Sequence, residues 1–312
     1  VAMRRWMSAM VPLPPGVVDG VAEDKGRLLA ASSAWDAGAT LLVEEPFVWV
    51  PNPSALNSLC THCLADLEPA ASFGCPSCDR PIFCSGSCHA MAASGYHGLE
   101  CEAWGLYERD EAAPDASPPL YRTLRHSRHT LLAARYVSML MSHLKRGDMD
   151  EVSTLNTQIG ELMGRGISFA DDPALLAAHK GLAKTVLAEG DNATAFDAKW
   201  FDVLMGKFQL NSFKIEVPAP DGGWRDLGVG LYRHASKINH SCEPNVQVQF
   251  GANARKPAKL TLVALADIAP GDELCIAYCD PDETISQRDH YLATAYGFDC
   301  GCAKCLRERS KA

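Results

Sequence analysis

The chain has 312 residues, of which 47% are hydrophobic and 21% are charged, a composition typical of a folded globular protein with room for inserted modules. Its 38 acidic and 29 basic residues give a net charge of -9, which disfavours nucleic-acid binding and suits a lysine-rich protein partner. No apolar run approaches the roughly 18 residues that span a bilayer, and no secretory signal opens the chain, so we expect a cytoplasmic or nuclear protein without a membrane segment.

The first predicted elements are short strands within residues 17–50. Runs rich in β-formers occupy 40–43 and 47–50, and Gly26 and Gly38 mark turns.

A cysteine cluster between residues 60 and 101 follows, and then an acidic, proline-containing loop at 109–119. From residue 120 to about residue 206, apolar residues recur every three or four positions, which predicts helices. Beyond residue 208 the pattern returns to strands, so the chain has the order β, zinc, α, β. These last strands are predicted at 213–217, 246–250, 260–263 and 274–278.

A basic stretch opens the helical region. Two interpretations stay open: a solvated helix face balanced by the acidic residues 110–115, or a surface that binds an acidic partner. Its members are Arg122, Arg125, His126, Arg128, His129 and Arg135.

The thirteen cysteines favour metal sites over disulfides, because thiols inside the cell are kept reduced. Between residues 60 and 101, four pairs of residues have the spacing of zinc ligands, which predicts two tetrahedral zinc sites. Spacing alone does not choose which pairs share a zinc. His62 and His89 could compete as ligands, but we expect both to be surface residues. The predicted ligands are Cys60, Cys63, Cys75, Cys78, Cys84, Cys88, His97 and Cys101.

Three further cysteines lie within residues 300–305 and need a fourth ligand from elsewhere. Cys242 is the natural candidate, because it leaves only Cys275 and Cys279 without a site. We expect those two to be small buried residues with inert thiols. The third predicted site is Cys242, Cys300, Cys302 and Cys305.

Four motifs follow one another along the chain in the order seen in a known family, which the chain therefore resembles. The string Asn-His-Ser-Cys-Glu-Pro-Asn at 239–245 resembles the SET-domain signature, and Gly-Asp-Glu-Leu at 271–274, leading to Tyr278, resembles its second signature. The cysteines at 300–305 resemble the post-SET zinc motif. With the MYND-like finger after the first strands, nearly the whole chain resembles the SET-and-MYND (Smyd-type) lysine methyltransferases.

The resemblance implies an α+β fold: a SET-type β-fold of short strands, split by a MYND zinc finger and a helical insert and closed by a post-SET zinc motif. The implied parts are the amino-terminal SET part (1–56), the two-zinc MYND finger (57–105), the helical insert (106–206), the carboxy-terminal SET part (207–285) and the post-SET motif (286–312).

The resemblance also implies an interleaved pairing of finger ligands, and hence three zinc ions in all. Cys60, Cys63, Cys84 and Cys88 would hold the first zinc. Cys75, Cys78, His97 and Cys101 would hold the second.

The activity implied is methylation of lysine side chains on histone or non-histone proteins, with S-adenosylmethionine as the methyl donor and Tyr278 as the catalytic residue. The implied substrate channel is lined by Phe213, Tyr278 and Tyr296; plain core packing is the alternative for Phe213 and Tyr296. The residues implied in binding the donor are Lys25, Gly26, Arg27, Asn211, Asn239, His240, Tyr278 and Phe298.

A lysine amine attacks only when neutral, and an apolar channel beside a cationic sulfonium lowers its pKa from the usual value of about 10.4, so no dedicated base is required. The loop 239–242 also has a structural interpretation, because its polar groups can tie neighbouring backbone together. The alternative function is a catalytically silent module that binds other proteins. Intact Asn239, His240 and Tyr278 favour the enzyme.

The chain departs from the family at three places. Leu28 stands where the donor-site turn usually has glycine. His89 stands where the finger usually has glutamine, so peptide binding by the MYND module is not predicted. The family typically continues into a carboxy-terminal helical domain, whereas this sequence stops seven residues after Cys305, so we expect a short form or a truncated chain.

Overall fold

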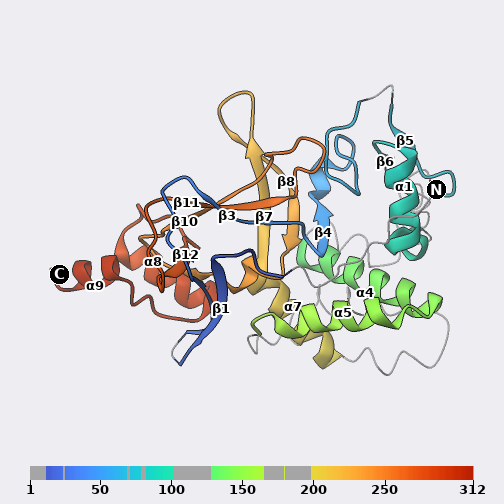
Figure 1. Ribbon diagram of the computed structural model, residues 1–312. Helices are drawn as coiled ribbons and strands as arrows, with labels where there is room; N and C mark the ends of the chain where they lie inside the picture. Colours follow the sequence, from blue (N-terminus) through green and yellow to red (C-terminus); the bar gives the residue numbers. More distant parts are fainter. Residues whose placement is uncertain are drawn as a thin grey trace. The chain divides into compact units, whose positions relative to one another are not determined.

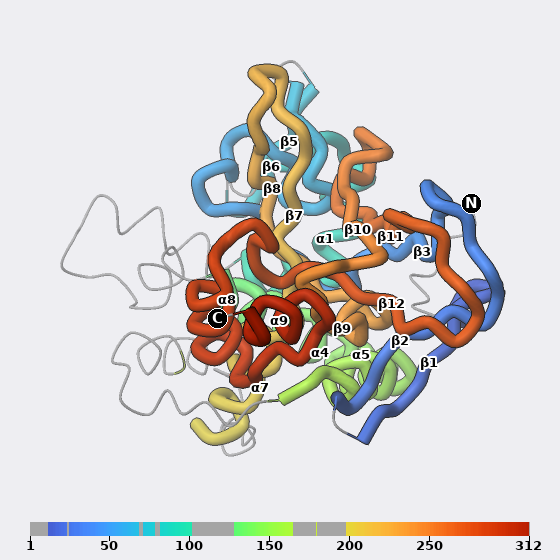
Figure 2. Tube along the Cα trace, turned by 90° about the vertical axis from the view of Figure 1, so that its left-hand side faces the viewer, coloured from blue at the N-terminus to red at the C-terminus, as the bar shows by residue number. Residues whose placement is uncertain are grey.

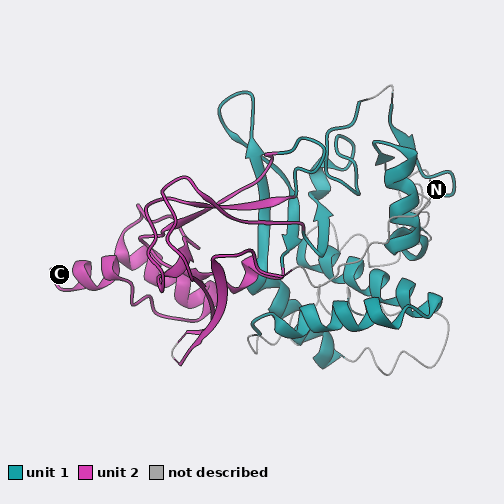
Figure 3. Ribbon diagram, viewed as in Figure 1, with its two compact units in different colours: residues 1–10, 46–232, 253–258 teal, residues 11–45, 233–252, 259–312 magenta. Residues whose placement is uncertain are grey.

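The chain forms two compact units that alternate along the sequence (Figures 1 and 3). Unit 1 comprises Val1–Met10, Pro46–Tyr232 and Asn253–Ala258, and unit 2 comprises Val11–Glu45, Arg233–Ala252 and Lys259–Ala312. Each unit is considered by itself. The computed structural model describes residues 12–23, 25–68, 71–78, 82–101, 128–164, 179 and 198–311.

The sheet of unit 1 has the order β4-β8-β7, with β8 (Trp224–Leu231) pairing antiparallel to β4 (Val48–Pro51) and to β7 (Ser212–Pro218). The central strand β8 was not expected from the sequence, because its glycines interrupt the alternation of side chains. Gly228 is required there by the close approach of β4, since a Cβ atom would lie 2.1 Å from the Val50 carbonyl oxygen.

Three helices complete the main core of unit 1: α4 (Arg128–Arg146), α5 (Met149–Glu161) and α7 (Ala198–Asn211). Gly147, at φ 71°, forms the tight turn between α4 and α5, and the Asp148 side chain accepts a hydrogen bond from the Glu151 amide to cap α5. Residues of all three helices pack on β4 and β8 in one cluster. It includes Val48, Val50, Leu132, Tyr136, Leu155, Phe201, Met205, Phe208, Val229 and Leu231.

The cysteine-rich segment of unit 1 forms a small module of the hairpin β5 (Phe73–Gly74) and β6 (Ile82–Phe83), then helix α1 (Gly86–Ala92) and a π-helical turn η2 (Ala93–His97). The Ser85 hydroxyl accepts from the Cys88 amide and caps α1. A 3-10 turn, η1 (Pro53–Ala55), precedes this module.

Arg135 of α4 joins this module to the rest of unit 1. Its guanidinium makes a buried ion pair with Glu100 at 2.6 Å, lies 3.6 Å from the centre of the Tyr96 ring and donates to the Trp49 carbonyl oxygen at 3.0 Å. The expectation of a solvated basic face is therefore wrong for Arg135. Arg128 pairs with Asp226. Arg122, Arg125 and His126 lie outside the described residues.

Unit 2 contains a sheet of the order β1-β2-β12-β9, made of β1 (Val17–Ala22), β2 (Gly26–Ala31), β12 (Glu273–Ile276) and β9 (Asn239–His240). β12 pairs antiparallel with β2 and parallel with β9, so it lies between two segments that are far from it in sequence. The 3-10 turn η4 (Ala235–Lys237) leads into β9.

A second sheet of unit 2 has β11 (Leu260–Ala264) between β10 (Val246–Gln249) and β3 (Thr40–Glu44). The tail of the chain adds α8 (Ile285–Tyr291), a π-helical turn η5 (Leu292–Tyr296) and α9 (Ala303–Arg309). Thr284 and Gln287 form a capping box at the start of α8. The tail helices lie beside each other in unit 2 (Figure 2), linked by an ion pair between Arg288 and Glu308.

The α+β class and the predicted strands at 40–43, 47–50, 213–217, 246–250, 260–263 and 274–278 are confirmed, most within one or two residues. Helix α7 continues to Asn211, beyond the expected end near residue 206. The expected loop at 109–119 lies outside the described residues. None of the helices in the described ranges has both the length and the apolar character needed to cross a membrane.

We expect Arg135→Met to lower the free energy of unfolding of unit 1 by about 3 to 5 kcal/mol, because it leaves the Glu100 carboxylate buried without its partner. Urea unfolding followed by tryptophan fluorescence measures this. The matched control is Arg225→Gln, which removes an exposed ion pair with Asp66 and should cost at most about 1 kcal/mol. Equal small losses from both variants would contradict the bracing role of Arg135.

Candidate functional site

The segment after β9 is fastened to β12 by the side chain of Asn245. Its amide nitrogen donates to the Glu273 carbonyl oxygen at 2.9 Å, and its amide oxygen accepts from the Cys275 backbone N–H at 2.8 Å. The backbone of Ser241 adds a bond to the Ile276 carbonyl oxygen at 2.9 Å. The side chain of Asn245, which lies outside the loop 239–242, thus satisfies the backbone of a neighbouring strand.

Lys25 and Asn239 meet at the carboxylate of Glu273. The Lys25 amine lies 2.7 Å from one oxygen, and the Asn239 amide nitrogen lies 2.9 Å from the other and 3.2 Å from the Arg27 carbonyl oxygen. Gly26 begins β2 with φ at 70°, a conformation that glycine adopts without strain. The structure therefore brings Lys25 and Asn239, from two distant segments, to one acidic side chain, and Asn239 also bonds the backbone of Arg27. Sequence reasoning gave no role to Glu273.

Tyr278 follows β12, and its hydroxyl donates to the Ile238 carbonyl oxygen at 2.6 Å. Burial raises the pKa of this phenol above its usual range, so the hydroxyl stays neutral. With its proton directed to Ile238, the lone pairs of the Tyr278 oxygen remain available as hydrogen-bond acceptors.

His240 connects Tyr278 to the sulfur of Cys242. The Tyr278 backbone N–H donates to His240 Nδ1 at 2.9 Å, and burial lowers the pKa of the imidazole to about 4, so the ring is neutral near pH 7. Since Nδ1 accepts, we assign the ring proton to Nε2, which lies 3.2 Å from the Cys242 sulfur.

Aromatic rings gather next to this histidine. The rings of Tyr278 and Tyr296 have centres 4.7 Å apart, and the centre of the Phe298 ring lies 6.0 Å from that of His240. Tyr296 and Phe298 are themselves neighbours at 6.4 Å. Within unit 2, residues from β9, from the end of β12 and from the turn after α8 thus form one aromatic cluster.

Asn211 and Phe213 belong to unit 1. Asn211 ends α7, and its side chain bonds both backbone groups of Met163, at 3.3 and 2.8 Å. Phe213 lies in β7 and packs edge-on against Tyr232, with ring centres 5.6 Å apart. Their roles in donor binding and in the substrate channel stay predictions.

All twelve predicted metal ligands fall into three groups of four, and the ligand atoms of each group lie within 4.8 Å of one another. In a tetrahedral site with Zn–S bonds of 2.3 Å, two sulfurs are separated by about 3.8 Å. The sulfur separations across the three groups are 3.5 to 4.0 Å, and the thirteen cysteines are free thiols. The groups are Cys60, Cys63, Cys84 and Cys88; Cys75, Cys78, His97 and Cys101; and Cys242, Cys300, Cys302 and Cys305.

His97 is the only nitrogen donor in these three groups. Burial, followed by the charge of Arg135, lowers the pKa of its imidazole to about 4, so a lone pair is available at neutral pH. Its Nε2 atom lies 3.6 Å from the Cys78 sulfur. The donor sets therefore fit zinc in number, type and spacing, and the pairs interleave in the manner that the resemblance implied.

The prediction that His62 lies on the surface is wrong. The residue is 4% exposed, its Nδ1 atom lies 3.2 Å from the Tyr96 hydroxyl, and its carbonyl oxygen accepts from the Trp49 indole at 2.5 Å. His89 is half-buried, with its ring close to those of Phe73 and Phe83. No pattern in the sequence signals these aromatic partners, because they come from separate segments.

Cys275 and Cys279 are half-buried, whereas we expected both to be buried. Burial raises the pKa of the Cys275 thiol to about 12 and also raises that of Cys279, which keeps both thiols protonated and unreactive. The Cys279 sulfur nevertheless lies within 4.8 Å of the ligand atoms of His240 and Cys242, a proximity that the spacing did not indicate.

Comparison with known proteins adds family relationships. Residues 217–279 match the SET domain family. A SET and MYND domain-containing protein of Dictyostelium discoideum is 27% identical over 278 residues, covering 85% of this chain and 76% of that protein; a second one is 24% identical and covers 91% and 58%.

Other relatives carry names of enzymes. The histone-lysine N-methyltransferase ATXR4 of Arabidopsis thaliana is 26% identical, covering 94% of this chain and 86% of that protein. A solved structure, the SET domain of LSMT bound to lysine and AdoHcy, is similar with a TM-score of 0.43 and 14% identity, covering 93% of this chain and 54% of that one.

We expect Asn245→Ala to lower the free energy of unfolding of unit 2 by about 2 to 3 kcal/mol, because it leaves two backbone groups of β12 without partners. Thermal unfolding measures the loss. Gln247→Ala, at an exposed position two residues away in β10, is the control and should have little effect. If Asn245→Ala unfolds like Gln247→Ala, the amide does not fasten the two segments.

Proposed function

We propose that this chain, a member of the SET-and-MYND family, transfers a methyl group from S-adenosylmethionine to the side-chain amine of a lysine in a protein substrate. The observation that carries the proposal is the neutral hydroxyl of Tyr278, whose proton is directed to Ile238 and whose lone pairs lie beside an aromatic cluster. The SET domain match and the lysine methyltransferases among the relatives support it.

S-adenosylmethionine supplies an electrophilic methyl group on a positively charged sulfur. We assign its recognition to the polar residues around Glu273 and to the ring of Phe298. The Asn239 amide and the Lys25 amine are held by the carboxylate of Glu273 and offer polar groups to the donor. Phe298 is 37% exposed and lies next to His240, so its ring offers an apolar face on which the adenine ring of the donor can pack. Gly26, Arg27, Asn211, His240 and Tyr278 complete the proposed set.

The chain's own residues align the lysine and keep it neutral. An amine that enters an apolar, aromatic channel loses solvation, which lowers its pKa and favours the neutral nucleophile. The Tyr278 oxygen accepts a hydrogen bond from that amine and fixes the direction of its lone pair. Tyr296 and Phe213 line the proposed channel, where their rings favour a methylated ammonium product.

We propose that the chain binds three zinc ions, two in the cysteine-rich module of unit 1 and one in unit 2. Their role is structural, because each donor set is a closed group of four ligands. The third site joins Cys242, which follows His240, to the tail that carries Tyr296 and Phe298.

We further propose a protein substrate, histone or non-histone, in the cytoplasm or nucleus. The net charge of -9 favours a basic peptide and disfavours nucleic acid. The finger's role is proposed to be structural and not peptide recognition, since Arg135 braces it against α4.

We expect Tyr278→Phe to reduce methyl transfer to a lysine peptide by about 100-fold or more, because it removes the only polar atom proposed to orient the amine. Transfer of labelled methyl groups to a peptide array measures this. Tyr136→Phe, which removes a hydroxyl that bonds Asn156 in unit 1 and belongs to no proposed site, is the control and should keep wild-type transfer.

Stabilisation by S-adenosylmethionine in thermal unfolding should remain in both variants, because the donor binds the folded state and its other proposed contacts are unchanged. Full transfer by Tyr278→Phe would refute the assigned role. A wild-type chain that is not stabilised by the donor and transfers no methyl group would favour the catalytically silent module.

We expect three zinc ions per chain, and Cys305→Ser to lose one of them together with methyl transfer, because a site of four thiolates loses a ligand next to the aromatic cluster. Elemental analysis measures the zinc content. Cys275→Ser, which changes a thiol outside the three groups of four, is the control and should keep all three ions. A Cys305→Ser protein that retains three zincs would contradict the third site.

A further inference from the structure

Arg288 of α8 is buried almost completely, although it carries a charge that the proposed reaction does not use. Its side chain is 1% exposed. A charge removed from water at this cost persists only where other groups compensate it. The surroundings of Arg288 therefore indicate what the charge is for.

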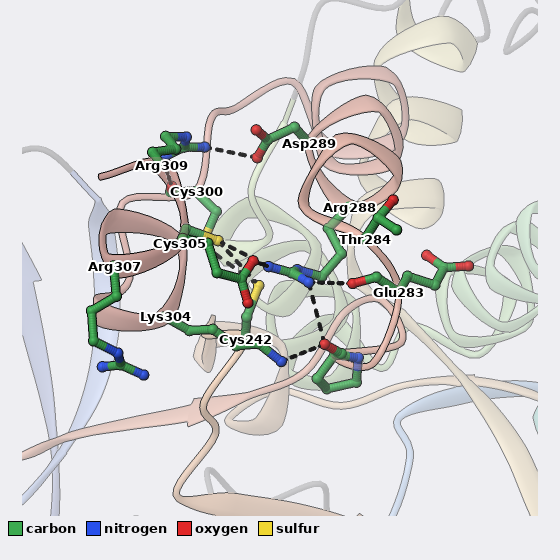
Figure 4. Close-up of polar contacts among 12 residues, drawn as sticks. Cys242, Glu283, Thr284, Arg288, Asp289, Cys300, Lys304, Cys305, Arg307 and Arg309 are labelled. Carbon is green, nitrogen blue, oxygen red and sulfur yellow. Dashed lines mark hydrogen bonds and ion pairs between the residues drawn. The ribbon is translucent and has the colours of Figure 1, made fainter. Parts of the chain in front are cut away.

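The guanidinium makes contacts on two sides (Figure 4). On one side it donates to the Cys305 sulfur at 3.8 Å and pairs with the Glu308 carboxylate at 2.5 Å. On the other side it donates to the carbonyl oxygen of Pro281 at 3.3 Å and to that of Glu283. Pro281 and Glu283 belong to the turn that directly follows Tyr278 and Cys279.

The sulfur contact matters because of the charge of the proposed site. Four thiolates around one divalent zinc leave a net charge of about -2, which a nearby cation offsets. Arg288 is the only buried arginine or lysine among the described residues of unit 2. The other two arginines of the tail, Arg307 and Arg309, are exposed and pair with the carboxylates of Glu243 and Asp289.

The turn after Tyr278 is also held from the zinc-binding helix. The Lys304 amine of α9 donates to the same Pro281 carbonyl oxygen, at 2.6 Å. Arg288 of α8 and Lys304 of α9 thus donate hydrogen bonds to the same turn, and both helices lie next to the cysteine sulfurs (Figure 4).

We propose that Arg288 is a positioning residue of the four-cysteine site in unit 2: its charge stabilises the zinc-bound thiolates, and its hydrogen bonds attach the turn after Tyr278 to that site. The proposal rests on the third zinc site proposed above. Arg288 acts through the sulfurs and the turn and does not touch the reacting groups.

The test compares zinc release from the full-length, zinc-loaded variants Arg288→Gln and Arg307→Gln with increasing concentrations of a coloured chelator. We expect Arg288→Gln to release one zinc at a chelator concentration about 10- to 100-fold lower than wild type, the effect typical of losing an outer partner of a metal ligand. The two other zincs should be released as in wild type. Arg307→Gln removes an exposed charge of α9, the helix that carries Cys305, and should match wild type throughout.

A second measurement separates charge compensation from a loss of packing. In the cobalt(II)-substituted protein, the band from thiolate-to-metal charge transfer should move to longer wavelength in Arg288→Gln, because a thiolate that loses an N–H donor gives up its electrons more easily. An unmoved band, or release of the third zinc at the wild-type chelator concentration, overturns the proposal. If Arg288→Gln does not fold, Arg288→Lys is the deciding variant. We expect it to release the third zinc at a lower chelator concentration than wild type, because an ammonium lacks the planar guanidinium that contacts both the Cys305 sulfur and the turn. Release at the wild-type chelator concentration overturns the proposal.

These outcomes are distinct from failure of the proposed function. A wild-type chain that binds only two zincs would overturn the third site itself. Zinc release does not depend on methyl transfer, so an inactive chain with a weakened third site in Arg288→Gln would still support the role of Arg288.

Discussion

The imidazole of His240 is the constraint on which the proposed site of unit 2 depends. A neutral imidazole has one donor and one acceptor, and both are engaged here: Nδ1 accepts from the Tyr278 backbone and Nε2 lies against the Cys242 sulfur. The position of Tyr278 is thereby coupled to Cys242, a predicted metal ligand. A small displacement of that ligand moves the tyrosine with it, and displacements of this size are costly when a reaction depends on alignment.

This coupling places the third group of predicted metal ligands and the proposed reactive residues in one part of unit 2. The strands that meet at the site are short, and β9 has only the two residues Asn239 and His240, so they bury little apolar surface of their own. Polar and sulfur contacts between distant segments compensate for this small apolar contact area. Asn245 ties its loop to β12, and Cys242 joins the same loop to Cys305, 63 residues further along the chain.

The local parts of this arrangement could be predicted from the sequence, because they are encoded by spacing. The alternation of side chains predicted the strands, and the close pairs of cysteines predicted the metal ligands. The buried position of His62 could not be predicted, since its partners Trp49 and Tyr96 come from separate segments. Strand β8 was missed for a related reason: Gly228 is required by the backbone of β4, and no side-chain pattern signals such an approach.

Both units also contain a buried arginine next to a group of predicted metal ligands, and this was not visible in the sequence. Arg135 pairs with Glu100, which precedes the ligand Cys101, and Arg288 contacts the sulfur of Cys305. Each guanidinium also donates to a backbone carbonyl oxygen in another segment. A planar fork with five donors serves a charged group and a carbonyl in fixed directions from separate nitrogens, whereas a lysine has three donors on a single nitrogen. In each unit the buried charge thus attaches a segment that carries predicted metal ligands to the rest of that unit.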